Sequence, residues 1–263
     1  YNLVAQDLTA YGTDFEGNRG IVSALPNLLQ TIDQSMIDKD FWLRLFYAYP
    51  VGVTQELLEY CVASPNICNY LDMPLQHIAK NVLKRMKRPL GEKGTRSLIE
   101  HMRTVAPELA LRTTFIVGFP GETEEDVAAL ESFILEGHFL HVGVFSYSQE
   151  AEAESFTFDQ QIEDSVKEER RARLFQAQQT VLAKKLDSFV GTKQKVLVEG
   201  FHADTDLLVT ARANFQGPDA DGQVLINDFG DDENFDPSSF FGKFIETEIT
   251  EVAGYDLIAR YEK

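Results

Sequence analysis

A strand, a glycine turn and a helix start follow one another between residues 111 and 126. The apolar, β-branched run 111–117 is too short for a helix and is typical of a strand. Gly118 and Gly121 force a turn after it, and Thr123 with Asp126 forms a capping box that begins a helix. Free N–H groups and the positive end of the helix dipole converge on such a turn, so it can hold a carboxylate or another anion. An ordinary strand-to-helix turn, with glycines for geometry alone, explains the same residues.

Strand-like runs alternate with helical patterns through the first part of the chain. This alternation predicts parallel βα units, and five strands are expected, at 3–5, 41–47, 70–73, 110–117 and 140–147. Polar residues follow each strand, and in a βα barrel the carboxyl ends of the strands form the active face. The pattern therefore favours an enzyme with one site at the barrel mouth.

After the last of these strands, the spacing of apolar residues changes. Residues 159–189 predict a long charged helix, in which the run 167–171 is expected to be a solvent-exposed face. Short strands separated by turns follow Gly191 and predict a small all-β barrel. We therefore expect two domains, 1–189 and 190–263.

Composition narrows the classes of function. The formal charge of −18 disfavours nonspecific binding to nucleic acid or to an anionic membrane, and it favours a basic partner or serves solubility alone. Two cysteines are too few for a disulfide framework, which predicts a cytoplasmic protein. The chain opens with Tyr1 inside a strand-like run, from which we expect a fragment whose N-terminal part is missing.

Several stretches together resemble the radical S-adenosylmethionine methylthiotransferase family. They are the segments 5–12, 70–77, 82–88, 112–123 and 145–148. The C-terminal part resembles the TRAM domain of that family, with its acidic turn at 217–222. The resemblance covers essentially the whole chain and is closest to the branch that modifies a ribosomal protein.

The resemblance implies an α/β fold, a partial parallel (βα) barrel of the radical S-adenosylmethionine type that keeps five of six units, followed by a TRAM barrel. It also implies two four-iron four-sulfur clusters in the full-length protein and a methylthio transfer to the β-carbon of an aspartate in small-subunit ribosomal protein twelve. A tRNA-modifying member of the family and a cluster-free binding module are the alternatives.

Residue roles toward S-adenosylmethionine follow from the resemblance and from side-chain chemistry. Arg112 suits the carboxylate, because a guanidinium binds it through two hydrogen bonds. Arg44 lies within a strand and is expected to be a ligand group or half of a buried ion pair. The other expected cofactor contacts are Gln6 and Asp7 to the amine, Gln76 and His77 to ribose or substrate, and Gly118, Gly121 and Glu122 around the adenine-side turn.

The chain departs from the family in its cysteines. The family holds a cluster with a CxxxCxxC motif, which is absent here, and Cys61 and Cys68 are expected to be apolar packing residues. We therefore expect no metal ligands and no cluster in this chain, and we assign no catalytic residue. A basic ribosomal protein is the expected partner, with no membrane or nucleic acid. Its expected contacts are Asp219, Asp221, Asp231, Asp232 and Glu233.

Overall fold

The computed structural model describes residues 1–15, 23–230 and 236–262. It divides into two compact units, Tyr1–Val181 and Leu182–Lys263. The division falls within helix α6 (Asp164–Asp187), eight residues before the boundary that the sequence predicted, because this helix continues unbroken into the second unit.

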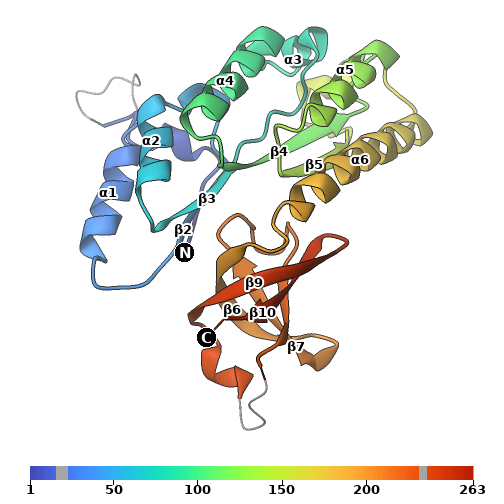
Figure 1. Cartoon of the computed structure of the whole chain (residues 1–263). Helices are drawn as coiled ribbons and strands as arrows, with labels where there is room; N and C mark the ends of the chain where they lie inside the picture. Colours follow the sequence, from blue (N-terminus) through green and yellow to red (C-terminus); the bar gives the residue numbers. More distant parts are fainter. Residues whose placement is uncertain (16–22, 231–235, 263) are drawn as a thin grey trace. The chain divides into compact units, whose positions relative to one another are not determined.

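The first unit contains a five-stranded parallel sheet in the order β1-β2-β3-β4-β5 (Figure 1). The strands are β1 (Asn2–Val4), β2 (Leu43–Phe46), β3 (Ile67–Asp72), β4 (Ala110–Val117) and β5 (His141–Ser146). The helices between and after them are α1 (Leu25–Ser35), α2 (Gln55–Ala63), α3 (Lys80–Arg85), α4 (Gly91–Val105), α5 (Glu124–Leu135) and α6. Three short 3-10 turns complete the unit: η1 (Leu8–Ala10), η2 (Pro50–Gly52) and η3 (Glu154–Thr157). The predicted βα alternation is confirmed, with a sheet open at β1 and β5.

The two faces of the sheet differ in chemistry. In β4, Phe115 and Val117 belong to the apolar core with residues of the surrounding helices. The alternate positions, including Arg112 and Thr114, turn to the opposite face because neighbouring side chains in a strand point to opposite sides. The helices therefore cover one face, and the polar side chains of the strands gather on the other.

Side chains cap the starts of two helices, and the sequence predicted the cap at Thr123. The Thr54 hydroxyl accepts a hydrogen bond from Leu57 N at 3.2 Å at the start of α2. Thr123 and Asp126 form a reciprocal capping box at the start of α5. These caps satisfy backbone donors that would otherwise be unpaired, and they fix where each helix leaves its loop.

The expectation of a solvent-exposed face at 167–171 is wrong for part of that run. Lys167 is only 7% exposed, and it packs against Gly118 in the turn after β4. Arg170 donates to Glu122 at 2.7 Å. A helical period places both residues on the side of α6 that meets the turn, which a count of charges does not reveal.

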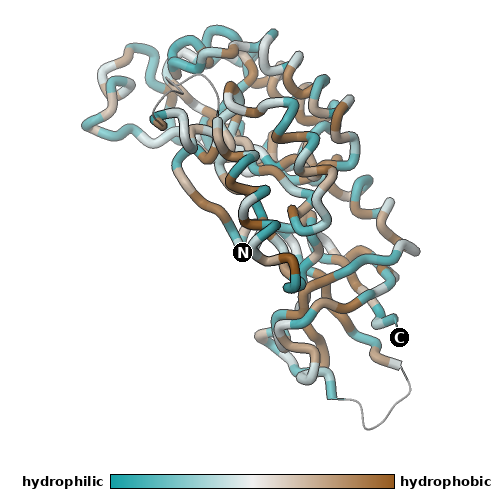
Figure 2. Tube along the Cα trace, turned by 90° about the vertical axis from the view of Figure 1, so that its left-hand side faces the viewer, coloured by the Kyte–Doolittle hydropathy of each residue, from teal (hydrophilic) through white to brown (hydrophobic). Residues whose placement is uncertain are grey.

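The second unit is a closed barrel in the order β10-β8-β7-β6-β9, which confirms the predicted all-β domain. Its strands are β6 (Lys193–His202), β7 (Thr205–Ala213), β8 (Val224–Asp228), β9 (Phe244–Ala253) and β10 (Asp256–Tyr261), with the short turn η4 (Pro237–Phe240). The buried apolar residues of these strands include Val196, Val198, Ile226 and Ile249, and Figure 2 shows hydrophobic and hydrophilic stretches in this part of the chain. Closure of the barrel pairs the edge strands.

Within the described ranges, no helix combines the length and the apolar character that a membrane crossing requires.

Candidate functional site

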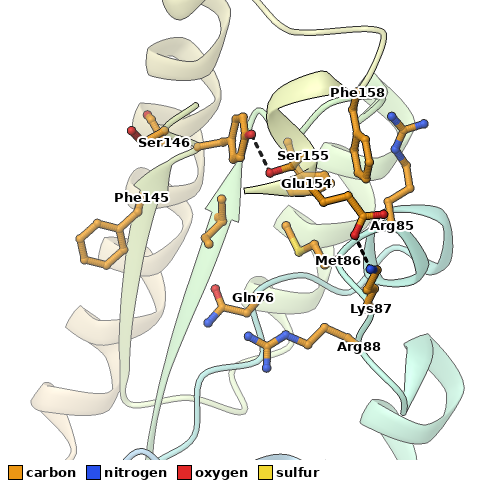
Figure 3. A pocket seen from close by; sticks show the side chains of 14 residues that line it. Gln76, Arg85, Met86, Lys87, Arg88, Phe145, Ser146, Glu154, Ser155 and Phe158 are labelled. Atoms are coloured by element: carbon orange, nitrogen blue, oxygen red, sulfur yellow. Dashed lines mark hydrogen bonds and ion pairs between the residues drawn. The ribbon is translucent and has the colours of Figure 1, made fainter. Parts of the chain in front are cut away.

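Two adjoining pockets lie at the carboxyl ends of the strands in the first unit. The polar pocket, of about 350 Å³, is lined by Gln6, Tyr47, Ala48, Tyr49, Pro74, Gln76, Arg88, Arg112, Thr114 and Phe145. The aromatic pocket, of about 550 Å³, contains four aromatic rings, from Phe119, Phe145, Tyr147 and Phe158 (Figure 3). Gln76, Arg88 and Phe145 line both pockets, so the two spaces meet at these residues.

The polar pocket brings together three of the residues selected from the sequence, Gln6, Gln76 and Arg112. Gln6 and Gln76 follow the ends of β1 and β3, and Arg112 lies on the face of β4 that is opposite the helices. This convergence is what a parallel sheet predicts for its carboxyl edge.

Gln76 combines backbone strain with an unsatisfied side chain. Its φ of 72° lies in the left-handed region, although it is not a glycine. Its backbone is fixed there by two hydrogen bonds of 2.8 Å to β4, one from its N–H to Thr114 O and one from Ile116 N–H to its carbonyl. Its buried Oε1 has no hydrogen-bond partner among the residues that the structure describes. A buried amide oxygen without a partner costs roughly 1–3 kcal/mol, which a bound ligand with an N–H or O–H group would recover.

Strained residues gather around these pockets. Five described non-glycine residues have positive φ, and three of them, Tyr47, Gln76 and Lys87, line one or both pockets. Each such conformation costs of order 1–3 kcal/mol and persists where the surrounding structure imposes it, commonly at ligand sites. The clustering therefore marks this region as a candidate functional site on grounds independent of pocket size.

Arg112 pairs with a residue that the sequence reasoning did not identify as its partner. Its Nη1 lies 3.0 Å from Oδ1 of Asp72, whose side chain is almost completely buried. The two residues occupy matching positions on the neighbouring strands β3 and β4. The pair neutralises much of the Arg112 charge and fixes the direction of its guanidinium group toward the pocket.

Arg44 lies within β2, as predicted, and is 5% exposed. Its Nη1 is 3.3 Å from Asn2 Oδ1, and its guanidinium carbon lies 5.6 Å from the centre of the Tyr70 ring. It lines neither pocket. Arg44 is therefore a buried residue that packs between side chains of the neighbouring strands β1 and β3.

His77 and Glu122 form a buried pair outside both pockets. The His77 Nδ1 accepts from Ala79 N at 2.9 Å, so its proton is on Nε2, which faces Glu122 Oε2 at 3.3 Å. The other Glu122 oxygen accepts from Gly118 N at 2.9 Å and from Arg170. The side chains of His77 and Glu122 have no exposed surface, so they position the turn rather than contact a ligand directly.

The remaining predicted contacts also have local roles. Gly118 and Gly121 have positive φ, and a side chain at Gly118 would clash with Lys167. The Asp7 carboxylate accepts from Thr9 N at 2.8 Å and from Tyr49 N at 3.3 Å, which ties the end of β1 to the end of β2. These residues shape the loops around the pockets and line neither of them.

The two cysteines are buried in the first unit. Burial raises the pKa of Cys61 to about 12 and that of Cys68 to about 11. Iron binds the thiolate form, so these two thiols do not fit a four-iron four-sulfur cluster. Among the described residues, no group of three or more His, Cys, Asp and Glu side chains is arranged to hold a metal ion.

The acidic residues predicted to contact a partner differ in their local structure. Asp219 is exposed, whereas the Asp221 side chain accepts from Gly217 N at 2.7 Å and shapes its turn. Asp231, Asp232 and Glu233 lie outside the described residues.

Sequence reasoning missed Arg88 and Thr114 as pocket residues, whereas Tyr49 was expected to line the mouth of the barrel. Thr114 could have been found, because alternation along a strand places it on the same face as Arg112. Arg88 follows a helix end, and its direction depends on the backbone turn at Lys87.

Comparison with known proteins shows which proteins and which domain this chain resembles. Residues 190–261 match the model of the TRAM domain. Over nearly all of its residues the chain is similar to members of the methylthiotransferase family that its motifs indicated.

The relatives are named ribosomal protein uS12 methylthiotransferase RimO. That of Syntrophotalea carbinolica is 42% identical over 98% of this chain and 53% of its own length. That of Protochlamydia amoebophila is 42% identical over 97% of this chain and 52% of its own, and that of Koribacter versatilis is 44% identical over 98% and 49%. The chain thus spans about half the length of the curated relatives it matches. The solved structure of coproporphyrinogen III oxidase HemN from Escherichia coli covers 72% of this chain and 51% of its own, with 13% identity and a TM-score of 0.47, too distant to add to the argument.

Proposed function

We propose that the first unit binds S-adenosylmethionine at its strand ends, as part of a methylthiotransferase that acts on ribosomal protein uS12. The observation that carries the proposal is Gln76, which is strained, unsatisfied and placed where two pockets meet. The relationship to proteins named for this activity supplies the reaction class.

The residues of the polar pocket suit the polar groups of S-adenosylmethionine. Gln76 Oε1 offers an acceptor to a ribose hydroxyl or an amine, and Gln6 offers a second amide. The Arg112 guanidinium, which Asp72 orients, suits a carboxylate. The pocket volume of about 350 Å³ lies at the lower end of the range for small-molecule sites.

The cofactor supplies hydrogen abstraction from an unactivated carbon and a methyl group, while the protein binds and orients it. No set of described residues fits an iron–sulfur cluster. In the proposal, any cluster has its ligands outside the residues of this chain.

The second unit supports a basic polypeptide as the macromolecular partner. Within residues 191–263 there are fifteen Asp and Glu against six Lys and Arg, a net charge of −9. RNA-binding domains usually carry a basic track, so this balance favours a ribosomal protein over a tRNA. The alternative, a cluster-free binding module, would have the same fold. Turnover by the full-length protein distinguishes the two, because the binding module would show none.

Calorimetric titration of S-adenosylmethionine into the chain tests the cofactor site. We expect Gln76→Ala to weaken binding at least tenfold, about 1.4 kcal/mol, because the substitution removes the acceptor. Gln30→Ala, at an exposed position on α1, should bind like the wild type. Equal affinity for the Gln76 and Gln30 variants would remove the polar pocket from the proposed site.

A further inference from the structure

Arg88 lies at the junction of the two pockets. It follows α3, where Lys87 adopts a left-handed conformation with a φ of 58° and Arg88 N donates back to Leu83 O at 2.8 Å. This closure turns the chain sharply after the helix. Figure 3 shows the Arg88 guanidinium and the Gln76 amide pointing toward each other across the pocket.

The other cations of the pockets have acidic partners. Arg85 pairs with Asp159 at 3.4 Å, and Lys87 pairs with Glu154. Arg112 pairs with Asp72.

Arg88 differs from these cations. Its guanidinium carbon lies 5.4 Å from the centre of the Tyr49 ring, which is a favourable contact but carries no negative charge. In the part of the chain that the structure describes, Arg88 makes no side-chain hydrogen bond and no ion pair. The lining of the two pockets therefore retains one positive charge that its own residues do not neutralise.

We propose that Arg88 binds a carboxylate at this junction, while Gln76 Oε1 accepts a hydrogen bond from an N–H group of the same ligand. The planar guanidinium fork matches the two oxygens of a carboxylate. A single uncompensated cation balances one negative charge, so the site suits a carboxylate better than a dianion such as phosphate.

A ligand with a carboxylate and a nearby N–H group has two possible sources. One is an acidic side chain of a polypeptide together with its own backbone amide, for which the open aromatic pocket of about 550 Å³ provides space. The other is the amino-acid end of S-adenosylmethionine. The choice between these sources rests on the proposed function, whereas carboxylate binding by Arg88 does not.

Two matched ligand pairs test the inference on the whole chain. The first is N-acetyl-aspartate methylamide against N-acetyl-asparagine methylamide, followed by NMR titration. The second is S-adenosylmethionine against its decarboxylated form, followed by calorimetry. The variants are Arg88→Gln and the matched control Lys84→Gln, an exposed cation on α3, and thermal melting establishes that both are folded.

We expect the carboxylate ligand of at least one pair to bind at least tenfold more tightly in the wild type and in Lys84→Gln. In Arg88→Gln this preference should fall below threefold, while Arg88→Lys should restore only part of it. A preference in the first pair assigns the site to an acidic side chain, and one in the second assigns it to the cofactor.

The inference is overturned if neither pair shows the preference, or if Arg88→Gln retains it. Failure of the proposed function has a different result, because neither form of S-adenosylmethionine would then bind. An Arg88-dependent preference for the aspartate compound would still support the inference in that case.

Discussion

Glu122 shows how one buried carboxylate can join several chain segments. It accepts from the backbone of the turn after β4 and from Arg170 of α6, and it faces His77 after β3. The Glu122 side chain has no exposed surface, so all three contacts are shielded from bulk solvent. Removing one partner of such a buried pair leaves the other charge uncompensated.

We therefore expect Glu122→Gln to lower the free energy of unfolding by about 3 kcal/mol, measured by urea denaturation. The control is Glu124→Gln, which removes a carboxylate whose side chain is 63% exposed and paired with Arg173. That variant should lose less than about 1 kcal/mol, because exposed ion pairs contribute little. Similar losses in the two variants would contradict the role given to burial.

The cysteines should be chemically inert in the folded chain. Burial raises the pKa of Cys61 to about 12 and that of Cys68 to about 11, so few thiolates exist at pH 8 and access is restricted. We expect an aromatic disulfide reagent to label the native chain at least a hundredfold more slowly than the chain in guanidinium chloride. Native labelling at the rate of a free thiol would show that one cysteine is accessible.

At the scale of elements, Asp33 connects α1 with α2 and with the segment that enters β3. Its carboxylate accepts from Tyr60 OH at 2.7 Å, Ser64 Oγ at 2.6 Å and Asn66 Nδ2 at 2.8 Å. Burial acts to raise the pKa of Asp33, but these three hydrogen bonds outweigh it, and the pKa is lowered. The ionised carboxylate therefore connects the two helices and the segment before the strand through hydrogen bonds.

This lowered pKa makes the contribution of Asp33 depend on pH. Because the folded pKa lies below the unfolded one, the contribution is complete above the unfolded value and is lost as the pH falls through the folded value. We expect Asp33→Asn to cost roughly 1–2 kcal/mol at pH 7 and clearly less at pH 3, by denaturant unfolding. Asp38→Asn, an exposed change, should show no such difference between the two pH values.

Elements whose pattern is local were predictable from sequence, and contacts between elements were not. The strand at 110–117 and the cap at Thr123 depend on neighbours in the chain, and both predictions are confirmed. The pairing of Arg112 with Asp72 depends on strand register. Likewise, the burial of Lys167 depends on the rotation of α6, which periodicity in a highly charged helix does not fix.

At the scale of the whole molecule, the charge of −18 should govern encounters with macromolecules. Complementary charge raises association rates, and salt screens this effect. We expect the whole chain to bind ribosomal protein uS12 with an association rate that falls at least tenfold between 50 and 300 mM salt, and to bind tRNA negligibly. A preference for tRNA at physiological salt would favour the tRNA-modifying alternative.

Residues 191–263 carry half of the net charge on a smaller share of the chain, so the second unit should contribute strongly to this steering. Reversing Asp204, in the turn between β6 and β7, and Asp206, at the start of β7, to lysine should slow association severalfold and change dissociation little. The matched control reverses Asp38 and Glu108, exposed acidic residues of the first unit. Stopped-flow fluorescence separates the two rates, and equal slowing in both double variants would assign the effect to net charge alone.

The left-handed backbone of Gln76 sets folding and binding in opposition at one position. Glycine adopts that conformation without a steric penalty, so Gln76→Gly should unfold at the same temperature as the wild type or higher, while binding its ligand at least tenfold more weakly. A lower melting temperature would show that the backbone there is not strained. Laboratory selection of this protein for heat resistance alone would therefore enrich glycine at position 76, and the survivors would be robust proteins with an impaired site.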